Sequence, residues 1–167
     1  MYQQVFIEPP EYQAWSDSEL IAIFNQYVLS GHLFVAKSSE RLIGFCASVP
    51  LLASKLWQTQ ASDGSAKYTL DADFLRLRFG IDALHARYIG DLGVAASYRN
   101  QGVATRLMQV VMQGGEPVVI RVSLCRESAI ALYKKLGFKP MNLFQTASYK
   151  QCDGSVKVFE KMLMILS

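Results

Sequence analysis

The sequence predicts an α/β fold, because strand-like and helix-like segments alternate along the chain. Residues 88–94 form an apolar run typical of a strand. Residues 103–114 then place apolar or small residues at offsets of 4, 7, 8 and 11, which is one face of a helix. Residues 33–49 read as two strands joined by a short polar turn. With 167 residues, 51% of them apolar, the chain is expected to form one domain over residues 1–167.

The N-terminal third predicts a strand followed by a helix. Residues 3–7 are expected to form a short first strand. Ser16 and Glu19 form a capping box, which indicates the start of a helix that extends to Ser30. Residues 51–87 follow no firm period, and ordered connections of this length often carry function.

The C-terminal half predicts a strand, a helix and two final strands. Residues 118–124 read as a strand. Residues 128–136 carry a helical apolar stripe. Residues 139–149 and 155–166 are expected to pair as a hairpin, and the second strand has apolar residues on both faces, so it is expected to be covered on both sides.

Composition excludes several classes of protein. The net charge of +3 is small and the basic residues are scattered, which argues against nucleic acid as a partner. Cys46, Cys125 and Cys152 are odd in number and form no C-x-x-C pair, so neither a disulfide framework nor a zinc site is expected, and no metal is predicted. No signal peptide and no apolar run of about 18 residues is visible. The expectation is a cytoplasmic protein that does not associate with a membrane.

The turn between residues 94 and 103 carries the strongest functional signal. Gly102 lies where a polar turn becomes a helix, and a helix N-terminus offers unpaired N–H groups and a partial positive charge. This geometry suits a phosphate or pyrophosphate. The alternative is a tight turn before a packed helix that binds nothing. The G-x-G-x-x-G fingerprint of dinucleotide-binding folds is not present.

Two motifs in order resemble a known family. Arg99-x-x-Gly102-x-Ala104 resembles the acetyl-coenzyme-A motif R/Q-x-x-G-x-G/A of the GNAT N-acetyltransferase superfamily. In that family a strand follows, and then a helix that ends in a leucine–tyrosine pair and a glycine–phenylalanine pair, as residues 132–138 do here. The resemblance implies an α/β (α+β) fold with a mixed, mostly antiparallel sheet of about six to seven strands and about four helices. It also implies that the sheet is splayed to admit the cofactor.

The resemblance implies a set of cofactor-binding residues. The strand before the turn would bond the pantetheine arm and the acetyl carbonyl through its backbone, and the turn would hold the pyrophosphate. Arg99 and Arg106 would add positive charge, although an ordinary solvated helix start explains Arg106 equally well. Arg126 stands where the family often has an asparagine, which leaves the usual amide contact open. The set consists of Leu92, Gly93, Val94, Arg99, Asn100, Gln101, Gly102, Val103, Ala104, Thr105 and Arg126.

Two residues are candidates for proton transfer. Tyr133 matches the tyrosine that commonly gives a proton to the departing thiolate in the family, and the alternative is a core residue of its helical stripe. Asp91 is the carboxylate nearest to the expected acetyl position, so it is the candidate general base, and the alternative is an aspartate satisfied by neighbouring backbone. Gly93 predicts a bulge or a close backbone approach, with a packing glycine as the alternative. Cys125 is expected to be a buried structural cysteine rather than a nucleophile.

The predicted function is acetyl transfer from acetyl-CoA, as co-substrate, to a primary amine in a ternary complex. The acceptor, a small molecule or a peptide, is not identified by the sequence. A domain that binds CoA as a sensor without turnover, and transfer of a longer acyl group, are the alternatives. A nucleotide-binding or purely structural domain would not bind CoA at all. Dimers are common in the family, so a homodimer is left open.

Overall fold

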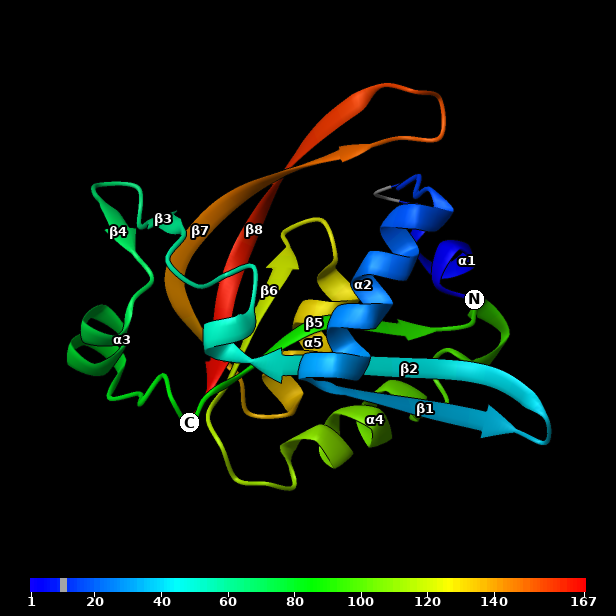
Figure 1. The fold of residues 1–167 in the computed structure, drawn as a ribbon, viewed down its shortest axis with the longest axis horizontal. Coiled ribbons are helices and arrows are strands. Elements are labelled where there is room, and N and C mark those ends of the chain that lie inside the picture. The colour runs from blue at the N-terminus through cyan, green and yellow to red at the C-terminus, as the bar shows by residue number, and fades with distance from the viewer. Residues whose placement is uncertain (10–11) are drawn as a thin grey trace.

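The structure is a computed structural model that describes residues 1–9 and 12–167, and these residues contain an eight-stranded sheet (Figure 1). The strand order is β1-β2-β5-β6-β8-β7-β3-β4. β5 and β6 run parallel, and the other neighbouring pairs are antiparallel. The predicted mixed, mostly antiparallel class is therefore confirmed. The strands are β1 (His32–Ser38), β2 (Arg41–Pro50), β3 (Gln60–Ser62), β4 (Lys67–Thr69), β5 (Arg87–Val94), β6 (Val118–Ser123), β7 (Lys139–Lys150) and β8 (Val156–Leu166).

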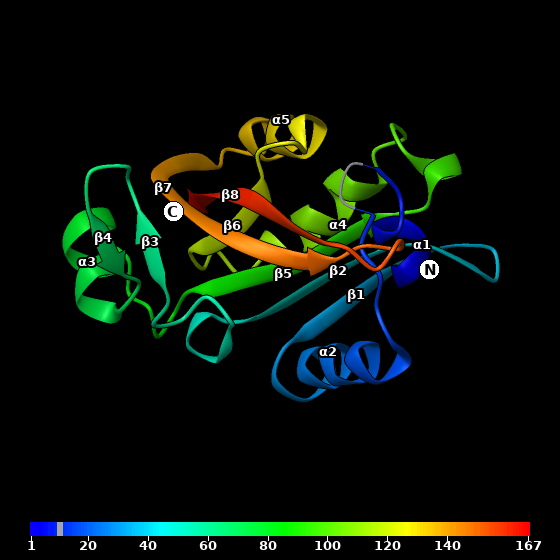
Figure 2. The same cartoon turned by 90° about the horizontal axis from the view of Figure 1, so that it is seen from above.

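Helices cover both faces of the sheet. Figure 2 shows α2 on one face and α4 and α5 on the other, with α1 beside the β5 end of the sheet. The predicted capping box is present, since the Ser16 hydroxyl accepts from the Glu19 amide and the Glu19 carboxylate accepts from the Ser16 amide. In the part of the chain that is described, no helix has the length and apolarity needed to cross a membrane. The helices are α1 (Tyr2–Phe6), α2 (Asp17–Ser30), α3 (Ala72–Phe79), α4 (Val103–Met112) and α5 (Glu127–Lys135).

The first segment is a helix, so the strand predicted over residues 3–7 is wrong. In α1, Tyr2 and Val5 lie three residues apart on one face, and both are buried. They pack on Phe45, whose ring stacks on that of Tyr2 at 5.5 Å between centroids. A strand would instead have put Val5 and Ile7 on the same face, yet Ile7 is exposed. Five residues fit either period, and the tertiary contact decides between them.

Residues 51–87 contain more regular structure than the sequence suggested. β3 and β4 pair with each other, and β3 joins the sheet through β7. Asp71 caps α3 by accepting from the Phe74 amide at 2.9 Å, and Gly80 ends the helix with a φ of +68°. Residues 51–87 thus add two strands and one α-helix, whereas α1 replaces one expected strand by a helix. Among the described residues the sheet has eight strands instead of the expected six or seven, and there are five α-helices instead of about four.

Alternation along the central strands builds two cores. Ala47, Val119 and Leu163 face α2, whereas their neighbours Cys46, Ile120 and Met164 face α4 and α5. All six side chains are buried, so the sheet is covered on both sides at its centre. This confirms the prediction that the last strand is packed on both faces.

The parallel strands β5 and β6 pair only at their first three positions. The partners are Arg87 with Val118, Tyr88 with Val119 and Ile89 with Ile120. Beyond Ile89 the two strands separate, while β5 stays paired with β2 as far as Val94. The backbone of Gly90–Val94 therefore has no strand partner on the β6 side. We call this opening between β5 and β6 the fork.

Two glycines of β5, Gly90 and Gly93, lie at the fork, and at each of them another side chain packs where a Cβ atom would stand. Gly90 is the extra residue of a β-bulge, because Ala47 pairs with Asp91 and its neighbour Ser48 pairs with Ile89. A Cβ on Gly90 would collide with the Tyr27 hydroxyl. A Cβ on Gly93 would lie 2.5 Å from the Phe45 ring. The bulge that Gly93 was expected to mark thus falls at Gly90, whereas the close approach at Gly93 comes from a side chain.

Replacing Gly93 by alanine is expected to destabilise the fold. The added methyl group would overlap the Phe45 ring, which is itself held by Tyr2, so the free energy of unfolding should fall by about 1–3 kcal/mol. Urea unfolding measures this. The matched control is Gly114→Ala, where the nearest atom would lie 3.6 Å away, and a change within about 1 kcal/mol is expected. Equal stability of the two variants would contradict the packing described here.

Candidate active site

Two adjoining cavities open at the fork. The first, the fork cavity, has a volume of about 130 Å³ and lies between α1, β5, β6 and the β7–β8 hairpin. The second, the helix-end cavity, has a volume of about 300 Å³ and lies between the end of β5 and the starts of α4 and α5. Val5, Leu92, Arg126 and Ala129 line both, so the two cavities meet at the open edge of β5.

The helix-end cavity has the features of an anion site. Gly102 is the N-cap of α4 with a φ of +79°, and no side chain caps the helix. A Cβ on Gly102 would meet no atom within 4 Å, so a ligand could approach the backbone there. The N–H groups of the first turn, Val103 to Thr105, border the cavity at the positive end of the helix. These residues fit a pyrophosphate.

The structure brings nearly all of the predicted cofactor-binding residues to this one cavity. Gln101 is the exception, because its side-chain amide donates to the Ser97 carbonyl at 2.9 Å and does not line the cavity. Arg106 is exposed and also lies outside the lining. The lining residues from the predicted set are Leu92, Gly93, Val94, Arg99, Asn100, Gly102, Val103, Ala104, Thr105 and Arg126.

Arg99 is held in place by two contacts. Its Nε donates to the Val94 carbonyl at 3.1 Å, and its guanidinium pairs with the Glu8 carboxylate at 2.7 Å. The first contact ties the turn to the end of β5, and the second ties it to the segment after α1. Arg99 therefore stabilises the shape of the turn, and Glu8 already offsets part of the positive charge that the sequence assigned to the cofactor.

Asp91 lies at the fork and is held by two tyrosines. Tyr27 from α2 donates a hydrogen bond to its carboxylate, and Tyr2 from α1 is a second hydrogen-bond partner. Burial, and then the negative charge of Asp91, raise the pKa of both phenols well above their usual value, so both remain neutral donors. A carboxylate has about four acceptor positions, so Asp91 keeps capacity for a further donor in the fork cavity.

Tyr133 faces the same cavity from the opposite side of the sheet. It comes from α5, packs against Phe138 and belongs to the core on the α4 and α5 face. Burial raises its pKa well above the usual value for tyrosine, so the phenol is protonated at neutral pH. Tyr133 is therefore a core residue that also lines the fork cavity, and its role as a proton donor stays a prediction.

Cys125 corrects one expectation. It was expected to be buried, but it is exposed and lines neither cavity. The residue directly precedes Arg126 in the turn before α5, where the chain leaves the sheet. Cys46 is the buried cysteine, and burial raises the pKa of its thiol to about 12.

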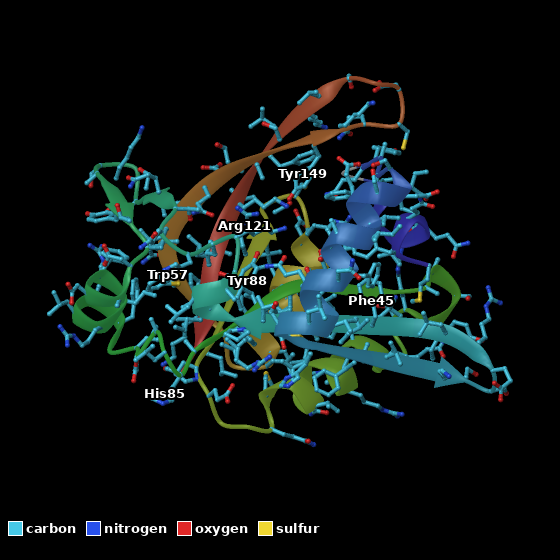
Figure 3. All side chains as sticks on the ribbon, viewed as in Figure 1. Phe45, Trp57, His85, Tyr88, Arg121 and Tyr149 are labelled. Atoms are coloured by element: carbon cyan, nitrogen blue, oxygen red, sulfur yellow. The ribbon has the colours of Figure 1, made fainter. Side chains whose placement is uncertain are left out.

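Most of the fork cavity is lined by aromatic, cationic and amide side chains that the sequence did not indicate. Figure 3 shows Tyr88, Arg121 and Tyr149, which come from the three strands β5, β6 and β7. The strand run V-V-I-R-V-S contains one charged residue, Arg121, and this could have been recognised as unusual for a central strand. The tyrosines gave no such signal. The missed lining residues are Tyr2, Phe6, Gln13, Trp15, Lys55, Tyr88, Arg121, Tyr149 and Lys161.

The β7–β8 hairpin bounds the fork cavity at its outer end. Gln13 forms a β-bridge with Gln151, and the Ala14 amide donates to the Lys150 carbonyl at 2.9 Å. Trp15 packs edge-on against Tyr149, and its indole N–H is buried without a hydrogen-bond partner among the described residues. The N-terminal segment and the hairpin thus enclose the cavity together.

A mixed sheet that opens between two parallel strands, next to an uncapped helix N-terminus, defines an acyl-CoA-dependent transferase fold of the kind the two motifs implied. The chain belongs to the acetyltransferase (GNAT) family, whose sequence profile matches residues 3–138. A curated relative, N-alpha-acetyltransferase 30 of Schizosaccharomyces pombe, is 34% identical over 56 residues, which is 30% of this chain and 37% of the relative. The chain thus spans little more than a third of that relative's length.

Solved structures support the fold. The ribosomal-protein-S18-alanine N-acetyltransferase of Escherichia coli is 18% identical with a TM-score of 0.56, over 98% of this chain and 81% of that one. NAA60 of Arabidopsis thaliana, solved with a bisubstrate analogue, is 22% identical with a TM-score of 0.55, over 87% and 80%. An N-acetyltransferase from Staphylococcus aureus is 18% identical with a TM-score of 0.58, over 93% and 79%. At these identities the likeness shows the fold alone.

Removing the Tyr27 hydroxyl is expected to weaken the fork. Tyr27→Phe takes one donor from the half-buried Asp91 carboxylate, so the free energy of unfolding should fall by about 1–3 kcal/mol. The matched control is Tyr68→Phe, which removes a Tyr–Asp hydrogen bond from Asp63. That carboxylate also accepts from Ser65 and Ala66, so a smaller loss is expected. Chemical unfolding of both variants decides, and an equal loss would contradict a special role for Tyr27.

Proposed function

We propose that residues 1–167 act as one acetyltransferase domain that moves an acetyl group from acetyl-CoA to a primary amine, directly and within a ternary complex. The observation that carries this proposal is the fork. The open backbone edge of β5 connects an uncapped helix N-terminus to a cavity that contains one candidate base and one candidate acid. Family membership supports the same reaction class.

The helix-end cavity is proposed to bind the cofactor, and the fork cavity is proposed to bind the acceptor amine. Amides at the start of α4 bind the pyrophosphate, and the free edge of β5 at Leu92–Val94 bonds the pantetheine arm and polarises the acetyl carbonyl. The cofactor supplies a thioester carbonyl and a thiol leaving group. The acceptor amine enters the fork cavity, where the tyrosine-held carboxylate of Asp91 can receive its proton.

The proposed step balances in atoms and charge. The amine nitrogen forms a bond to the acetyl carbon, and the bond from that carbon to sulfur breaks. The amine gives one proton to Asp91, and the Tyr133 hydroxyl gives one proton to the departing sulfur. Asp91 later loses its proton to water and Tyr133 regains one, so the net products are an amide and the free thiol. The small volume of the fork cavity, about 130 Å³, favours an acetyl group over a longer acyl chain.

Blocking the helix N-terminus should abolish cofactor binding. Gly102→Glu places a carboxylate where the pyrophosphate is proposed to lie, so calorimetric titration with acetyl-CoA and with free CoA should show no binding. Gly115→Glu is the matched control, because Gly115 has a similar φ of +69°, equally open surroundings and a place beyond the other end of α4. The control should bind normally. Unchanged affinity in Gly102→Glu would contradict the site.

Removing the Tyr133 hydroxyl should lower turnover while leaving cofactor binding intact. Tyr133→Phe keeps the ring in the core, so kcat should fall by about a hundredfold or more with little change in CoA affinity or thermal stability. The raised pKa of Tyr133 means that its ionisation should not limit wild-type activity up to about pH 9. Parallel losses of stability and activity would return Tyr133 to a purely structural role. Normal turnover in Tyr133→Phe would remove the proposed acid role. CoA binding by the wild type without acetylation of any amine would favour the CoA-binding sensor.

A further inference from the structure

Arg121 is a guanidinium placed at the point where the sheet opens. It is the first residue of β6 beyond the last pair with β5, and it is the one charged residue of that strand. Its side chain is half-buried and lines the fork cavity on the same face as Tyr88 (Figure 3). The proposed mechanism gives this residue no part.

A chain of neutral groups fixes the position of Arg121. Its Nη1 donates to Gln145 Oε1 at 3.1 Å, and the Gln145 amide donates in turn to Thr59 Oγ1 at 2.8 Å and to the Gln60 carbonyl at 2.9 Å. Arg121 also donates to the Tyr88 hydroxyl. Gln145 is buried, so the guanidinium is oriented by a well-packed partner. None of these partners neutralises its charge.

Arg121 has no carboxylate partner in the described chain. Across residues 1–9 and 12–167, no carboxylate oxygen lies within 4.0 Å of its guanidinium. Asp91, a carboxylate of the fork cavity, is engaged by two tyrosines. A half-buried charge without a counter-ion is costly, and a ligand anion would offset that cost. The planar guanidinium group suits a carboxylate or a phosphate, which it can bind through two hydrogen bonds.

We propose that Arg121 binds an anionic group of the acceptor, and that the acceptor is therefore a primary amine with a carboxylate or phosphate within a few bonds of its nitrogen. The proposal rests on the proposed function, because it places the amine beside Asp91. Both Asp91 and Arg121 line the one cavity of about 130 Å³, so the two groups of the acceptor must be close together.

The same placement helps the chemistry. A positive charge near the amine disfavours its ammonium form, so Arg121 lowers the pKa of the bound acceptor and leaves more of it as the reactive neutral amine. An acceptor with several positive charges and no anion would be repelled. Arg121 thus selects against polyamine-like acceptors and for zwitterionic ones.

The test compares matched pairs of amines with the full chain and acetyl-CoA. The small-molecule arm sets glycine against glycinamide, β-alanine against its amide, and 2-aminoethyl phosphate against ethanolamine. The peptide arm sets a peptide that begins with aspartate against one that begins with asparagine. Within the preferred pair, kcat/KM for the anionic member should exceed that of its neutral partner by about tenfold or more. The arm that shows the preference identifies the source of the anion.

Variants then assign the preference to Arg121. Arg121→Gln should remove most of it by raising the acceptor KM, with the KM for acetyl-CoA unchanged, and Arg121→Lys should keep part of it. Arg76→Gln, an exposed arginine on α3, is the matched control and should behave as wild type. Neutral amines that react as fast as their anionic partners would overturn the acceptor class and leave the proposed function standing. CoA binding without acetylation of any amine would overturn both.

Discussion

β5 and β6 separate after three residue pairs, and both cavities open at that separation. A parallel pair buried on both faces would ordinarily continue, since unpaired backbone groups inside a protein are costly. Here the bulge at Gly90 turns β5 away while its ladder with β2 continues. Tyr27 lies against that bulge and holds Asp91. The packing of α2 against β5, through Tyr27, therefore stabilises the opening.

The sheet keeps two chemical environments apart and joins them only at this opening. On the α4 and α5 face, backbone amides and two arginines, Arg99 and Arg126, border a larger cavity suited to a polyanion. At the opening itself and toward the α2 face, aromatic rings enclose a smaller cavity that contains a carboxylate and several cations. Tyr133 and Asp91 approach the junction from opposite faces. Two substrates can thus approach each other from separate cavities that join at a few shared lining residues, which is the arrangement that direct transfer requires.

The sequence indicated those parts of the candidate site that are local in the chain. The turn from Arg99 to Thr105 and the helix with Tyr133 are short motifs, and residues of each line one of the two cavities. The fork cavity could not be predicted in this way, because its partners are distant: Tyr27 and Asp91 are 64 residues apart. Helix α1 was missed because five residues satisfy both periods. Helix α3 was missed although Asp71 and Gly80 mark its ends. Arg121 was visible as a lone charge, but its partner Gln145 was not.

The residues that fix the position of Arg121 extend beyond the two cavities. Gln145, Thr59 and Gln60 line neither of them, yet they set the direction of a side chain that does. Thr59 directly precedes β3 and Gln60 is its first residue, in the β3–β4 hairpin at the far edge of the sheet. Two diverged members of the family can therefore share every cavity-lining residue and still present the arginine differently. Drift in a peripheral hairpin is thus a route by which acceptor preference can change during evolution while the reaction itself is inherited intact.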